Sequence, residues 1–162
     1  MSKHDPDTTA TECMACLKPL GTPQFFISRA YERTIFYSNG RYPEIEIMAA
    51  EAIGSYCSGK CLNFEKIAIL IRENVRSTFP GIGPVESCSR CGRPVDMTRF
   101  HRTWTESEEE ITRGEYIEIS KPLSVTTLAV ACRNCEPPPS RVASADLIIS
   151  SIEDCETEVP SR

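Results

Sequence analysis

Eight of the nine cysteines stand in closely spaced pairs, and their thiolates are the groups in this chain best suited to chemistry. The pairs are Cys13 with Cys16, Cys57 with Cys61, Cys88 with Cys91, and Cys132 with Cys135. The tight turn within a pair aims both sulfurs at one ion, and two pairs complete the tetrahedron of a structural zinc site. The spacing therefore predicts eight metal ligands and two zinc ions. Iron held by four thiolates uses a similar turn and is the alternative metal.

An internal repeat indicates which pairs share an ion. Cys13, Cys16 and Cys57 each recur 75 residues later (88−13, 91−16, 132−57). The same shift places Pro19 on Pro94 and Phe25 on Phe100. Each copy is thus predicted to close its own site, with Cys13, Cys16, Cys57 and Cys61 in one and Cys88, Cys91, Cys132 and Cys135 in the other. An interleaved arrangement, in which each ion takes ligands from both copies, is the alternative.

Closed four-cysteine sites argue against catalysis, because a catalytic zinc ion keeps one position open for water. The chain also has no phosphate-binding glycine loop, no G-x-S-x-G elbow and no H-E-x-x-H helix. His101 is expected to be an ordinary surface or half-buried strand residue, and Cys155 a free thiol that does not act as a nucleophile. We therefore expect a protein that is not an enzyme and has no small-molecule substrate.

The elements that must position the cysteines indicate a small, mainly β, metal-stabilised fold. It is predicted to consist of two tandem zinc-ribbon-like hairpin modules, with one helix after the first and a short C-terminal helix. The predicted segments are a disordered leader (1–12), zinc module 1 with its helix (13–79), a Pro/Gly linker (80–87), zinc module 2 (88–135) and an acidic, Pro-containing tail (136–162). Modules of this size have marginal hydrophobic cores, so each is expected to unfold without its metal.

Aromatic and β-branched runs predict the strands of both copies. In the first copy, strands at 24–28, 34–38 and 41–42 surround Asn39-Gly40, the strongest short-range signal for a hairpin turn. In the second copy, strands are predicted near 99–104, 109–112, 116–119 and 124–131.

One apolar stripe predicts the helix after Cys61. Its members are Phe64, Ile67, Ala68, Ile71 and Val75. We expect the stripe to cover the first zinc site and hairpin, and a docking helix is the alternative. In the tail, Ser144 is a candidate N-cap for a short helix over 146–152 that folds back or orders on a partner.

The net charge of −5 and the acidic tail disfavour nonspecific binding to phosphate backbones. We therefore expect a protein–protein interaction, adaptor or regulatory module. The alternative is a nucleic-acid-binding zinc ribbon, related to transcription or RNA, that uses the first hairpin. Its expected contact residues are Arg29, Tyr31, Arg33, Arg41 and Tyr42, in which aromatic and basic side chains alternate.

The first residues contain no apolar segment of the kind an export signal needs. No run approaches the roughly 20 apolar residues of a membrane span. We therefore expect no membrane association, and a cytoplasmic location.

The motifs Cys88-Ser89-Arg90-Cys91-Gly92 and Tyr56-Cys57-Ser58-Gly59-Lys60-Cys61 resemble the knuckles of zinc-ribbon and treble-clef zinc fingers. The resemblance covers roughly residues 13–76 and 88–135, and it implies a hairpin-built zinc fold without a particular activity. The first copy departs from the pattern in two ways. Leu17 stands where the glycine would be, and three residues separate Cys57 from Cys61.

Overall fold

The computed structural model describes residues 11–138 and is mainly β, as predicted. Its elements in chain order are β1 (Gln24–Ile35), β2 (Glu44–Tyr56), α1 (Gly59–Arg72), β3 (Val85–Ser87), β4 (Pro94–Asp96), β5 (His101–Arg113) and β6 (Glu118–Ala131). No helix within this range is long and apolar enough to cross a membrane. Most of the predicted leader, the predicted tail helix and Cys155 lie outside the described residues.

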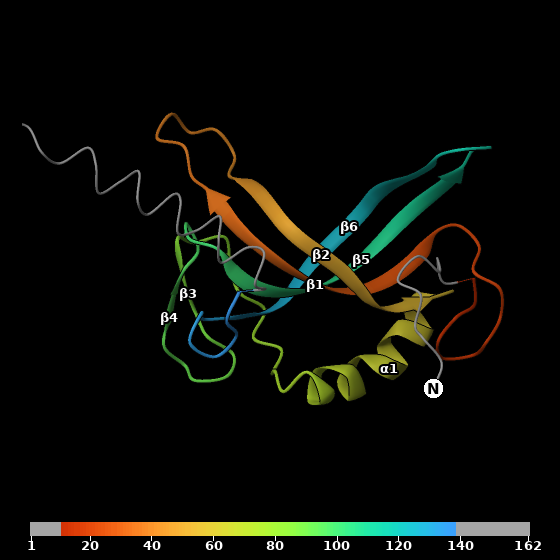
Figure 1. Ribbon diagram of the computed structural model, residues 1–162, viewed down its shortest axis with the longest axis horizontal. Coiled ribbons are helices and arrows are strands. Elements are labelled where there is room, and N and C mark those ends of the chain that lie inside the picture. Colours follow the sequence, from red (N-terminus) through yellow and green to blue (C-terminus); the bar gives the residue numbers. More distant parts are fainter. Residues whose placement is uncertain (1–10, 139–162) are drawn as a thin grey trace, which may run out of the picture.

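A single four-stranded antiparallel sheet contains strands from both copies of the repeat. Its order is β2-β1-β5-β6, while β3 and β4 form a separate two-stranded ribbon. The inner strands β1 and β5 pair from Gln24 opposite Glu109 to Glu32 opposite His101. Figure 1 shows the result: two long hairpins cross at the centre of the sheet and their tips diverge. The sequence alone predicted both hairpins but not the pairing that joins them.

The strands are longer than predicted in both copies. In the first, the predicted strand at 34–38 is not separate, because β1 continues to Ile35 and pairs there with Glu44. Asn39-Gly40 therefore lies within the loop of residues 36–43 and not in a two-residue turn, although Gly40 does have a positive φ of 75°. In the second copy, the four predicted strands form only β5 and β6. Cross-strand pairing extends both strands through polar segments that have weak intrinsic β-propensity.

The two hairpins are related by an approximate two-fold axis. The β1–β2 register shifts at Ile27/Ser28 and Tyr31/Glu32, and the β5–β6 register shifts at Trp104/Thr105 and Glu108/Glu109, in each case 77 residues later (104−27, 108−31). Ser28 lies directly opposite Thr105, its own counterpart under this shift. The β1–β5 contact is therefore self-complementary, with the axis between these two residues.

This geometry corrects one match made from sequence. The shift of 75 relates the cysteines, but the β1 and β5 strands are related by 77, so Phe25 is not the counterpart of Phe100. Phe25 lies within β1, whereas Phe100 precedes β5 and stacks on Tyr31 at a centroid distance of 5.8 Å. The cause is two additional residues between the second knuckle and β5. The true counterpart of Ile27 is Trp104, and both side chains are fully buried.

Helix α1 packs against both halves of the molecule. Leu62 and Ile69 join the core beside the first cysteine group. Leu70, with Val75 just beyond the helix, joins the core that contains Trp104 and the end of β6. The core of the second copy therefore includes apolar side chains that belong to the predicted first module (13–79).

Two ion pairs orient α1 beneath the sheet. Lys66 Nζ lies 2.6 Å from Glu106 of β5, and Glu73 at the helix C-cap lies 3.0 Å from Arg29 of β1. Arg29 and Glu106 are counterparts under the two-fold axis (106−29) but carry opposite charges. Since Lys66 and Glu73 are also opposite in charge, reversing the helix would place like charges together.

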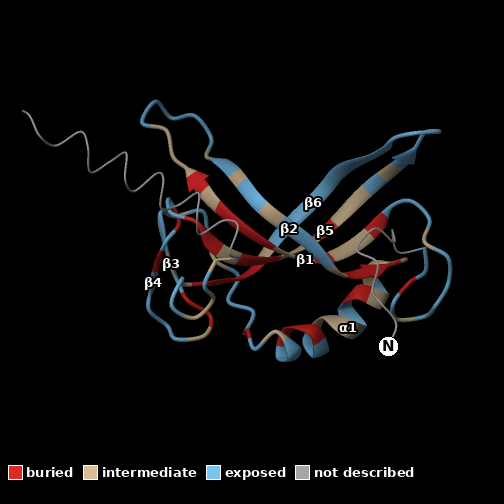
Figure 2. Cartoon of the chain, viewed as in Figure 1, coloured by how far each residue is buried: buried red, intermediate tan, exposed pale blue. Residues whose placement is uncertain are grey.

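Most of the predicted apolar stripe of α1 faces solvent. Phe64 is 80% exposed, and Ile67, Ala68 and Ile71 are also exposed, whereas Val75 is buried as predicted. The expectation that the stripe covers the first zinc site is therefore wrong: four of its five members face solvent, and Val75 packs in the core that contains Cys88 and Trp104. The helix is apolar on two faces, and the sheet covers the one that contains Leu62, Ile69 and Leu70. Figure 2 shows exposed positions along the helix and on both hairpin tips.

A fragment of residues 80–138 tests whether the second copy of the repeat needs α1 and β1 in order to fold. We expect it to remain unfolded even with excess zinc, because it lacks Leu70 and Val75 and leaves β5 without its β1 partner. Circular dichroism and the dispersion of amide proton resonances would be compared with those of residues 11–138 under the same conditions. A well-dispersed spectrum for the zinc-loaded fragment would instead establish an independent second module.

Candidate metal centres

The structure brings the eight paired cysteines into two groups of four, each drawn from one copy of the repeat. Within a group, all four Sγ atoms lie within 4.8 Å of one another. The Sγ–Sγ distances include 3.5 Å for Cys16 and Cys57, 3.8 Å for Cys57 and Cys61, and 3.6 Å for Cys91 and Cys132. Four sulfurs at a zinc–sulfur distance of about 2.3 Å would be about 3.8 Å apart. Each group therefore has the dimensions of a tetrahedral thiolate site.

The sulfurs are positioned as ligands and not as disulfides. All eight cysteines are free thiols, and the separations above far exceed a disulfide bond of about 2.05 Å. In both groups one thiol is buried, one is exposed and two are half-buried, in the same sequence order. The two sites thus repeat in burial as well as in ligand type.

The two N-terminal knuckles have the same backbone geometry despite the leucine in the first. Leu17 has a positive φ of 62°, and its counterpart Gly92 has a φ of 72°. Leu17 N donates to the carbonyl oxygen of Cys13 at 2.8 Å, and Gly92 N to that of Cys88 at 2.9 Å. Leu17 therefore preserves the turn while adopting a conformation that favours glycine.

The C-terminal halves of the sites differ. In the first, Ser58 caps α1 by accepting a hydrogen bond of 3.2 Å from Cys61 N, so Cys61 lies in the first helical turn. The positive end of the helix dipole favours a thiolate there. In the second, no helix follows Cys135 within the described residues. The sites agree in one contact, because the backbone N–H of Cys57 donates to the Cys13 sulfur and that of Cys132 donates to the Cys88 sulfur.

The thiols differ in acidity within each group. Burial opposes ionisation of Cys13 and Cys88, but backbone N–H groups around each sulfur lower the pKa of both to about 6. A hydrogen bond with Cys16 is the main cause that raises the pKa of Cys57, and one with Cys91 that of Cys135, each to about 12. Cys13 and Cys88 therefore ionise more readily than Cys57 and Cys135, and a metal ion that binds must displace the protons of Cys57 and Cys135.

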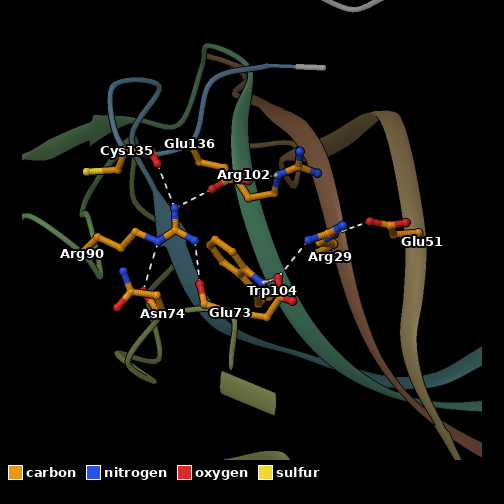
Figure 3. A network of polar contacts seen from close by, with 9 residues as sticks. All are labelled: Arg29, Glu51, Glu73, Asn74, Arg90, Arg102, Trp104, Cys135 and Glu136. Carbon is orange, nitrogen blue, oxygen red and sulfur yellow. Dashed lines mark hydrogen bonds and ion pairs between the residues drawn. The ribbon is translucent and has the colours of Figure 1, made fainter. Parts of the chain in front are cut away.

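Arg90, inside the second knuckle, ties that site to the end of α1 (Figure 3). Its guanidinium donates to the carbonyl oxygens of Glu73 at 2.6 Å, Asn74 at 3.1 Å and Cys135 at 2.8 Å. It also pairs with the Glu136 carboxylate and lies 5.4 Å from the centre of the Trp104 ring. One side chain therefore satisfies backbone carbonyls at the helix end and at the last cysteine together.

The network continues to the centre of the sheet. Trp104 Nε1 and Arg29 both donate to the same oxygen of Glu73, at 3.2 and 3.0 Å, and Arg29 also pairs with Glu51 of β2. Arg29 and Trp104 lie opposite each other on β1 and β5. The helix end, the second metal group and the two inner strands thus share one polar network. Neither Glu73 nor Arg90 was predicted from sequence; the only signal was a basic residue inside C-x-x-C.

The residues predicted for nucleic-acid contact lie along the first hairpin, but most face protein groups. Arg29, Arg33 and Arg41 each pair with a glutamate. Tyr31 is fully buried and so offers no face to a base, whereas Tyr42 is 91% exposed.

His101 is not the surface or half-buried residue that the sequence predicted. It is 1% exposed, and its Nδ1 donates to the carbonyl oxygen of Arg99 at 2.8 Å. Burial lowers its pKa and favours the neutral ring. The reason is its place at the start of an inner strand, where its two-fold counterpart Gln24 is also buried.

Comparison with family models, curated proteins and solved structures finds no match to this chain. The resemblance to zinc-ribbon knuckles therefore depends on the two cysteine groups alone. Those groups show that the protein could hold two metal ions.

Replacing Leu17 with glycine tests the strain in the first knuckle. Relief of the left-handed conformation is worth about 1–2 kcal/mol, partly offset by the greater entropy of glycine in the unfolded chain. Because Leu17 is largely exposed, little packing is lost. We expect Leu17→Gly to raise the unfolding free energy of the metal-loaded protein by about 0.5–1 kcal/mol in chemical denaturation. Leu123→Gly, an exposed strand position, is the control and should be destabilising; a similar loss for Leu17→Gly would refute the argument.

Arg90→Lys tests the polar network. Lysine keeps the charge but cannot reach three carbonyl oxygens at once, so we expect a loss of about 2–3 kcal/mol in unfolding free energy. Amide exchange at Glu73 and Val75 should accelerate while both metal ions remain bound. The control Arg93→Lys changes an exposed arginine of the same knuckle and should cost less than about 0.5 kcal/mol. Equal tolerance of the two substitutions would contradict the assigned role of Arg90.

Proposed function

We propose that this protein is a non-enzymatic, zinc-stabilised adaptor that binds a protein partner through the outer face of α1. The observation that carries the proposal is the exposure of Phe64, Ile67, Ala68 and Ile71 on one side of the helix. Burying large apolar side chains of this kind contributes about 1.5–3 kcal/mol each. Contiguous exposed apolar surface is characteristic of interaction sites.

Zinc is the proposed metal because four thiolates in tetrahedral array suit it, and because a closed set leaves no position for substrate. The metal would have a structural role at both sites. The first site lies at the start of α1, and the second is joined through Arg90 to the helix end. Loading both sites would hold the helix against the sheet with its outer face ready for binding, which reduces the ordering cost of association.

The charges beside the apolar face favour an acidic partner segment. Lys60 and Arg72 are exposed at the two ends of the helix, and no ion pair among residues 11–138 involves either of them. An amphipathic helix or strand with apolar residues and flanking carboxylates would complement this face.

The alternative, a nucleic-acid-binding zinc ribbon, has weaker support. Arg29, Arg33 and Arg41 would have to leave their glutamate partners before they could neutralise phosphates. Such intramolecular neutralisation reduces the counterion release that drives nucleic-acid binding. The net charge of −5 also disfavours binding to a phosphate backbone.

The metal and the partner surface are tested separately. Native mass spectrometry with elemental analysis should find two zinc ions per chain, and one in either Cys16→Ser or Cys91→Ser. Iron in place of zinc would overturn the metal assignment but not the surface.

For the surface, proteins captured by the wild-type chain would be compared with those captured by the Phe64→Ser/Ile67→Ser variant. The control is Ile117→Ser/Ile119→Ser at the tip of the second hairpin, which removes comparably exposed apolar side chains far from α1 in sequence. A partner retained by the control and lost by the α1 variant supports the proposal. Equal capture by all three proteins would refute it.

A further inference from the structure

Glu32 is a buried carboxyl without a cationic partner. It lies on β1, an inner strand of the sheet, and is 7% exposed. None of the ion pairs formed by residues 11–138 includes it. Burial raises its pKa, an effect that the neighbouring Thr103 hydroxyl only partly opposes. An acid in this position is costly to ionise unless a cation joins it.

The second copy of the repeat shows that this environment is not a requirement of the fold. The two-fold counterpart of Glu32 is Glu109 (109−32), which is half-exposed. Glu109 accepts hydrogen bonds from the hydroxyls of Ser107 and Ser120.

The first copy lacks both of those donors. The counterpart of Ser107 on β1 is Ala30 (107−30), and that of Ser120 on β2 is Ile45 (120−45, by the shift that relates Cys132 to Cys57). Apolar side chains thus replace the groups that would satisfy the carboxylate of Glu32.

Glu32 lines a cavity of about 220 Å³. The cavity is lined by residues of the first hairpin and of the linker that precedes β3. Figure 1 shows the loop of the first hairpin at the same end of the molecule as the β3–β4 ribbon. Much of its wall is apolar, with Phe36, Pro43, Ile45, Pro80, Ile82 and Met97 contributing. Glu32 is the only charged residue among those that line it.

The charged groups around the cavity also favour a cation. At the linker, a Glu86 carboxylate oxygen would lie 3.2 Å from a Cβ placed on Gly81 and 3.6 Å from one on Gly83, so a second carboxylate lies beside two glycines that line the cavity. Arg33, the next residue of β1, points to the opposite face of the sheet and pairs with Glu46. His101, opposite Glu32 on β5, is buried and favours its neutral form.

We propose that this cavity is a binding site for an alkylammonium group, whose apolar stem contacts the Pro80–Ile82 and Phe36–Ile45 walls while its charged end pairs with Glu32. A cavity of this volume is smaller than typical drug-sized sites and suits a single short chain. The ammonium supplies a cationic partner, and hydrogen bonds beyond the one that the Thr103 hydroxyl offers to Glu32. The source of the ammonium is either a free small amine or a lysine side chain of a peptide. This site is distinct from the α1 face and does not depend on the proposed adaptor function.

The test uses the zinc-loaded full chain and three probes of similar length. Binding of n-pentylammonium would be followed through the methyl resonances of Ile45, Ile82 and Met97, with 1-pentanol and pentanoate as the neutral and anionic comparisons. We expect saturable shifts with the ammonium, at least about tenfold weaker binding of the alcohol, and no binding of the carboxylate. Replacing the free amine with N-acetyl-lysine methylamide distinguishes the sources, because a peptide lysine should bind at least as tightly if that is the natural ligand.

Two isosteric variants complete the test. Glu32→Gln should retain the fold and weaken n-pentylammonium binding at least about tenfold while leaving 1-pentanol binding unchanged. Glu46→Gln, which removes a carboxylate on the other face of the sheet, should leave both affinities unchanged. Equal affinity for the ammonium and the alcohol, unaltered ammonium binding by Glu32→Gln, or an absence of saturable shifts would each overturn the proposal.

Discussion

The antiparallel pairing of β1 with β5 is the constraint on which the rest of the structure depends. It joins two hairpins into one sheet and places their approximate two-fold axis between Ser28 and Thr105. It also sets Arg29 beside Trp104, where one glutamate at the end of α1 can accept hydrogen bonds from both. Without this pairing α1 would have no common surface to cover, and the two cores that it completes would be separate.

The cysteine groups and the polar network around Arg90 both stabilise a fold that has a small hydrophobic core. A sheet whose hairpin tips project into solvent buries little apolar surface, so its stability depends on specific local interactions. A four-cysteine group lies at the base of each hairpin. Arg90 of the second group donates a hydrogen bond to the C-terminal end of α1, the helix that begins at the first group. A metal ion bound at either group would therefore be connected, through α1 and Arg90, to the backbone at the other group.

The cysteine groups and the β character of the fold could be predicted from sequence because each depends on local spacing. The paired thiols require only a tight turn, and even Leu17 in place of glycine did not alter it. The joining of the hairpins, the burial of His101 and the solvent-facing side of α1 could not be predicted, because they depend on contacts between distant segments. The stripe from Phe64 to Ile71 has helical periodicity, but periodicity does not indicate which of two apolar faces a sheet will cover.

The approximate two-fold axis relates positions within one chain, and this determines how those positions can change by mutation. In an assembly of two identical chains, a single mutation changes both symmetry-related positions, so they must carry the same residue. Here both positions belong to one chain and can diverge independently. Arg29 pairs with Glu73 at the C-terminal end of α1, whereas Glu106, its counterpart, pairs with Lys66 near the middle of the helix. Glu32 lacks the two hydroxyl donors that Glu109 has. Covalent linkage of the two halves has allowed a symmetric framework to carry unlike sites.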